Sequence, residues 1–185
     1  MRRNCGAIKI EKKYIAIFAG AVLLTWIFHE LAHLIAGEML GYKMKMTLNS
    51  TYPAVGEHSS DLHNQIISAA GPIFTLCEAA VVCALMYWRK RILLYPFLFT
   101  CFYMRCMALF ISLFNSNDEA RISTAMGIGK FTLPIIVSGT LFYMVYKISL
   151  RYALSQEFNL ANLGLAILFS WVLILTDMFF HINLI

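Results

Sequence analysis

The segment TWIFHELAHLIAGEM, residues 25–39, places two histidines and a glutamate inside a strongly apolar stretch. On a helix, residues four apart lie on one face, so His29 and His33 can direct ring nitrogens at one metal ion. Glu30 follows the first histidine and can accept a proton from water beside the metal without being a ligand. This HExxH spacing predicts a zinc site for hydrolysis, with Glu30 as the catalytic base.

The plain alternative is a pair of core histidines hydrogen-bonded to neighbouring helices. Ionisable side chains are costly in hydrocarbon, and here three of them fall within five positions. A packing role does not offset that cost, so the metal interpretation is favoured.

A catalytic zinc ion has three protein ligands and a water, so one protein ligand is needed besides the two histidines. The segment LFNSNDEARIS, residues 113–123, offers Asp118 or Glu119 just past the third apolar block. Counting membrane crossings places this segment at the same membrane face as the HExxH end of the first block and the start of the second. The alternative for Asp118 is a solvated loop acid or a helix N-cap for residues 118–127.

The composition is that of an integral membrane protein. Of the 185 residues, 60% are hydrophobic and 14% are charged, and the mean hydropathy is +0.70. Soluble domains have about 45–50% apolar and about 25% charged residues. The net charge of +5 comes from basic residues between apolar blocks, which favours membrane orientation over nucleic-acid binding. The five cysteines form no CxxC pair, and we expect no disulfide framework.

Five apolar blocks are long enough to cross about 30 Å of hydrocarbon; they lie near residues 14–37, 64–88, 92–114, 128–148 and 162–182. We therefore expect one all-α, multi-pass domain over residues 1–185 in a cell membrane, with an uncleaved first span. The polar insert at residues 41–63 is expected to form a short strand or hairpin at the membrane surface.

The basic residues predict the orientation of the chain. Of the 15 Lys and Arg residues, ten fall on the N-terminal side, four fall on the opposite side and Arg105 lies within the third block. This imbalance predicts a cytoplasmic N-terminus. Arg105 requires an anionic partner inside the membrane, for which Glu78 and Asp177 are the candidates.

These residues resemble the site-2 protease family of intramembrane zinc metalloproteases. HELAHLIAGEMLG resembles the HExxH helix of that family, AAGPIF is similar to its Gly-Pro element, and NDEAR stands in the place of its third-ligand Asp motif. The resemblance covers about residues 15–125 and implies a three-helix core, with accessory helices over 128–182. It implies Zn²⁺ as cofactor, Glu30 as the catalytic acid and base, and three zinc ligands: His29, His33 and Asp118.

The chain lacks the PDZ or CBS domains of many relatives, and its charges place the site nearer the outer face, whereas family members usually have it nearer the cytosol. It also departs from the family motifs at two places. Thr75 stands where the family usually has Asn soon after Gly-Pro, and NDE replaces the usual Leu-Asp-Gly around the third ligand. The second departure leaves Asp118 and Glu119 both open as the third ligand.

The expected substrate is a membrane-embedded or membrane-adjacent protein or peptide. A transmembrane helix would have to unwind locally, because its carbonyls are held in internal hydrogen bonds. Gly71, Pro72 and the insert at 41–63 are candidates for holding the extended substrate. Asn115 could donate to the substrate backbone or to the oxyanion, or cap a helix. The competing functions are zinc or proton transport and peptide binding by a catalytically inactive relative.

Overall fold

The computed structural model describes residues 10–56, 59–180 and 182–185. Its helices are α1 (Lys12–Met39), α2 (Asp61–Arg89), α3 (Tyr95–Ile111), α4 (Asp118–Ala125), α5 (Thr132–Arg151) and α6 (Gln156–Phe180), and a 3₁₀ turn at Ile92–Leu94 precedes α3. Two short strands, β1 (Met44–Met46) and β2 (Thr51–Pro53), follow α1. In this part of the chain, five helices are long and apolar enough to cross a membrane: α1, α2, α3 with its 3₁₀ turn, α5 and α6. The expected all-α architecture is confirmed.

Local sequence signals define the ends of α2 and α3. Ser60 precedes α2 and its hydroxyl accepts a hydrogen bond from the His63 amide, which satisfies a free donor of the first turn. At the other end, Lys90 adopts a left-handed conformation with φ of 49° and terminates the helix. Pro96 lies in the first turn of α3, where its missing amide costs no hydrogen bond.

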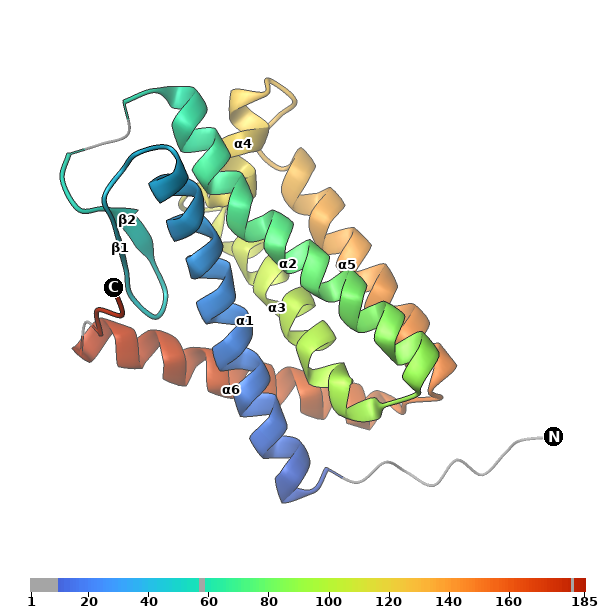
Figure 1. The fold of residues 1–185 in the computed structure, drawn as a ribbon. Coiled ribbons are helices and arrows are strands. Elements are labelled where there is room, and N and C mark those ends of the chain that lie inside the picture. The colour runs from blue at the N-terminus through green and yellow to red at the C-terminus, as the bar shows by residue number, and fades with distance from the viewer. Residues whose placement is uncertain (1–9, 57–58, 181) are drawn as a thin grey trace.

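Helices α2, α3 and α5 run side by side, α1 packs across α2 and α3, and α6 runs across the bundle (Figure 1). The main apolar core fills the half of the bundle that contains the start of α1 and the α2–α3 connection. Its fully buried side chains include Phe18, Met86, Tyr95, Leu98 and Leu141. The core extends to the cavity of the other half, where Trp26, Tyr103 and Met104 belong to both.

The end of α1, the start of α2 and α4 lie at one end of the molecule (Figure 1). This is the arrangement expected from counting membrane crossings. The insert at 41–63 contains the antiparallel hairpin β1–β2, with Lys45 paired to Tyr52. The expected hairpin is therefore confirmed.

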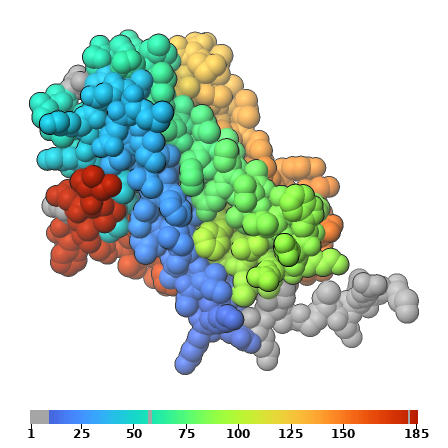
Figure 2. Space-filling view, in the orientation of Figure 1, coloured from blue at the N-terminus to red at the C-terminus, as the bar shows by residue number. Residues whose placement is uncertain are grey.

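Helix α6 is tied to this hairpin by its carboxyl-terminal part. The Asp177 carboxylate accepts hydrogen bonds from the Thr47 hydroxyl at 2.8 Å and the Leu48 amide at 3.1 Å. The Leu184 amide donates to the Met46 carbonyl at 2.9 Å, which adds a short backbone pairing to the outer edge of β1. The red residues near 185 accordingly lie against the hairpin in Figure 2.

Candidate metal centre

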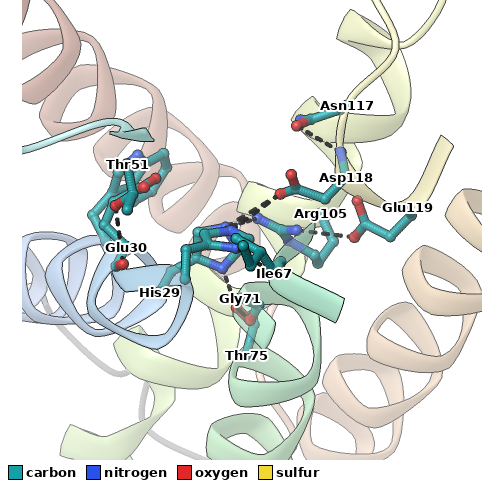
Figure 3. Close-up of polar contacts among 12 residues, drawn as sticks. His29, Glu30, Thr51, Ile67, Gly71, Thr75, Arg105, Asn117, Asp118 and Glu119 are labelled. Carbon is teal, nitrogen blue, oxygen red and sulfur yellow. Dashed lines mark hydrogen bonds and ion pairs between the residues drawn. The ribbon is translucent and has the colours of Figure 1, made fainter. Parts of the chain in front are cut away.

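The two histidines of the HExxH segment lie on the buried face of α1 that packs against α2. His29 is 3% exposed, and Glu30 and His33 are each 7% exposed. The Nε2 atoms of His29 and His33 are 3.2 Å apart, as expected for residues one turn apart on a helix. Asp118 Oδ2 lies 3.5 Å from His29 Nε2 and 3.4 Å from His33 Nε2 (Figure 3).

Hydrogen bonds to α2 fix the orientation of both imidazole rings. His33 Nδ1 donates to the Ile67 carbonyl at 2.6 Å. His29 Nδ1 is 3.1 Å from the Thr75 hydroxyl, which itself donates to the Gly71 carbonyl at 3.0 Å and therefore accepts from the ring. Each ring thus carries its proton on Nδ1, which leaves the Nε2 lone pair free to bind a metal.

The three converging atoms fit a metal ion. With the Nδ1 atoms protonated, His29 Nε2, His33 Nε2 and Asp118 Oδ2 are three electron-pair donors within 3.5 Å of one another. A proton on one ring nitrogen could be shared with only some of these lone pairs, whereas a single metal cation could bind all three atoms at once. In a tetrahedral zinc site with bonds of about 2.0–2.2 Å, neighbouring ligand atoms lie about 3.3–3.6 Å apart. The observed separations match this spacing.

Asp118 is brought to the histidines by the short helix α4. Asn117 caps this helix and its side chain accepts from the Asp118 amide at 2.9 Å, so Asp118 is the first helical residue and not the cap. Arg121, on the next turn, donates to Asp118 Oδ1 at 2.6 Å and leaves Oδ2 directed at the histidines.

Glu119, the alternative third ligand, has a different partner. Its Oε1 accepts a hydrogen bond from Arg105 Nη1 at 2.9 Å in a pair whose side chains are only 2% and 4% exposed. The structure therefore places Asp118, and not Glu119, with the two histidines. The expectation that Arg105 pairs with Glu78 or Asp177 is wrong, because Glu78 accepts from Thr25 and Asp177 binds the hairpin.

Gly71 lies where α2 passes closest to the histidine rings. A Cβ atom at this position would be 2.3 Å from His33 Nε2 and 2.4 Å from His29 Cε1, closer than any carbon can approach. Gly71 therefore makes room for the two histidine rings, a role that the sequence did not predict. Pro72 is buried beside it within α2. Their role in holding substrate stays a prediction.

Glu30 lines a cavity of about 830 Å³ together with the three candidate ligands. One wall of this cavity is the hairpin segment 49–53, and the Thr51 hydroxyl donates to the Glu30 backbone carbonyl at 3.0 Å. The other walls are mostly apolar side chains of α3 and α6, among them Met107, Phe110, Trp171 and Ile174. Glu30 therefore shares one cavity with the three candidate ligands, without belonging to their group.

Asn115 lies in the exposed turn between α3 and α4, where its amide donates to the Ile111 carbonyl. Asn117, two residues later, caps α4 and lines the cavity. The capping role considered for Asn115 therefore belongs to Asn117, and a contact between Asn115 and substrate stays a prediction.

No protein-family model, curated protein or solved structure matches this chain. The possible multi-pass membrane architecture and the buried His/His/Asp group follow from the structure itself.

Proposed function

We propose that this protein is an intramembrane zinc metalloendopeptidase of the site-2 protease type, which cleaves membrane-embedded or membrane-adjacent proteins. The observation that carries the proposal is the buried group of His29, His33 and Asp118, whose ligand atoms have tetrahedral spacing, with Glu30 in the same cavity. Zn²⁺ bound there would supply Lewis acidity to the scissile carbonyl and to the attacking water.

The residues of the chain have separate tasks in this reaction. Thr75 and the Ile67 carbonyl hold the imidazole rings, and Arg121 holds the Asp118 carboxylate. Glu30 accepts a proton from the attacking water and returns it to the leaving amine. The apolar walls from α3 and α6 exclude bulk water from a peptide in the cavity.

The free edge of β2 is suited to bind an extended substrate. Thr51 lies opposite Met46, whose amide and carbonyl bond to residues 184–185 and not to β2. In an antiparallel pair of this kind, the amide and carbonyl of Thr51 point away from β1. Since Thr51 also lines the cavity, a locally unwound substrate can add to β2 as a further strand beside Glu30.

Ion transport is less well supported by the same observations. A transport path needs ionisable groups across the whole membrane, whereas His29, His33 and Asp118 gather in one group. In the half of the bundle remote from the hairpin, the buried polar pair Tyr14–Asn162 carries no ionised side chain. An inactive peptide-binding relative is disfavoured by the intact Glu30, which sits buried in the cavity without being one of the three ligands.

The test compares cells that express the wild-type chain with cells that express Glu30→Gln at the same level. Mass spectrometry of newly formed protein N-termini detects cleavage products even when the substrate is unidentified. We expect membrane-protein cleavages that appear with the wild type and are lost with Glu30→Gln, while both proteins retain zinc. Identical N-termini in the two samples, with zinc present in both, would contradict the protease proposal.

A further inference from the structure

The Arg105–Glu119 pair is the most deeply buried ion pair beside the metal ligands in the described part of the chain. Arg105 comes from the membrane-spanning α3, and Glu119 directly follows Asp118 in α4. A buried ion pair is by itself weak evidence for stability, since both charges lose their hydration. Its location beside the candidate metal site therefore calls for a role other than stability.

We infer that Arg105 is a positioning residue, which holds α4 through Glu119 so that the Asp118 carboxylate reaches the two histidines. This inference rests on the proposed metal function and adds to it a residue outside the ligand set. It concerns how strongly the site binds zinc, which can be measured without any substrate.

Helix α4 depends on tertiary contacts for its place. It has only eight residues, and a helix this short is marginal in isolation. It packs against α2 and α5, and the buried Ser112 hydroxyl of the preceding turn accepts a hydrogen bond from the Asn117 amide at 3.4 Å. At its other end, Ser123 bonds to the Gly129 carbonyl and accepts from the Leu133 amide. The 2.9 Å contact between Arg105 and Glu119 anchors the first turn, which carries the ligand.

Arg105 is itself held firmly and also contacts the histidine side of the site. The Ser138 hydroxyl of α5 donates to the Arg105 carbonyl at 3.1 Å. Arg105 Nη2 lies 3.4 Å from His29 Nε2, while Nη1 binds Glu119 (Figure 3). One guanidinium group thus links the α1 ligands with the helix that carries Asp118.

The charge of Arg105 and its positioning role predict opposite changes in zinc affinity for Arg105→Gln. Removing a positive charge beside a cation site should tighten zinc binding on electrostatic grounds alone. If the ion pair positions Asp118, the same substitution should weaken zinc binding, because groups that orient metal ligands typically contribute about 10–100-fold in affinity. The sign of the change therefore distinguishes the two explanations.

The experiment measures the zinc affinity of detergent-purified protein by competition with a chelating dye. We expect Arg105→Gln to bind zinc at least about 10-fold more weakly than the wild type. The double variant Arg105→Met/Glu119→Leu removes both charges and leaves no buried unpaired ion, so it should fold. We expect the double variant to show the same loss of affinity.

Tyr14→Phe is the matched control for a purely structural effect. It removes the buried 2.6 Å hydrogen bond to Asn162, which belongs to the core remote from the ligands. We expect it to lower the thermal stability of the protein and to leave the zinc affinity unchanged. Zinc binding by Arg105→Gln or by the double variant as tight as in the wild type would overturn the positioning role while the proposed metal site stands. A wild type that binds no zinc would overturn both.

Discussion

Gly71 has no Cβ, and any other residue at this position would place one against the candidate ligands His29 and His33. Its virtual Cβ lies 2.3 Å from His33 Nε2, the atom that would bind zinc. Neither ring can retreat easily, since His33 is bonded to the Ile67 carbonyl and His29 to Thr75. A single methyl group at this residue is therefore expected to displace a ligand.

We predict that Gly71→Ala abolishes stoichiometric zinc binding, measured as metal content after purification. Gly139→Ala is the matched control, because it also lies within a helix and a Cβ there would have no neighbour within 4 Å. The control should keep the wild-type zinc content. One zinc per chain in Gly71→Ala would show that the rings can move aside and would contradict this account of the close approach.

Thr75 links the two helices beside His29. Its hydroxyl accepts from His29 Nδ1 while donating to the Gly71 carbonyl. A hydroxyl can do both at once, because it has one donor and two acceptor lone pairs. Thr75 therefore fixes the orientation of the first candidate ligand, His29.

Among the elements, the hairpin and α6 act together around the cavity. The Asp177 carboxylate holds the turn between β1 and β2 through Thr47 and Leu48, and α6 and the hairpin each form a wall of the cavity. The position of β2 over Glu30 thus depends on a residue of the last helix.

We predict that Asp177→Ala loosens the hairpin and leaves zinc binding intact. The Leu48 amide loses its acceptor, so hydrogen exchange of residues 44–53 should become faster. Glu157→Ala, at the exposed first turn of the same helix, should leave this exchange unchanged. Unchanged protection of residues 44–53 in Asp177→Ala would mean that the hairpin is held by its other contacts.

The sequence was sufficient for features that depend on local pattern. Helical spacing identified His29 and His33, hydropathy located the five long helices, and counting crossings brought Asp118 to their level. The choice between Asp118 and Glu119 depended on Arg105, which is 14 residues away from Glu119 and carries no sequence signal for its partner. The role of Gly71 could not be predicted either, because it arises from the approach of two helices.

At the scale of the whole molecule, the elements that carry the candidate metal site lie toward one end of the helix bundle. The end of α1, the start of α2, α4 and the hairpin lie toward one end of the molecule, and the start of α1 lies toward the other (Figure 1). The candidate ligands belong to α1 and α4. The end remote from the hairpin also carries most of the described basic residues at helix termini: Lys12, Lys13, Arg89, Lys90, Arg91, Lys147 and Arg151. The cytoplasmic position of that end stays a prediction from these charges.

The measurement that tests the central claim most directly is the zinc content of the detergent-purified protein under metal-replete conditions. We predict about one zinc per chain in the wild type and in Glu119→Ala at saturating metal, and none in Asp118→Ala. Glu119→Ala keeps all three ligands, so it can lower the affinity without removing the site. A wild-type protein without zinc, or an Asp118→Ala variant that keeps it, would contradict the proposed His29, His33 and Asp118 centre.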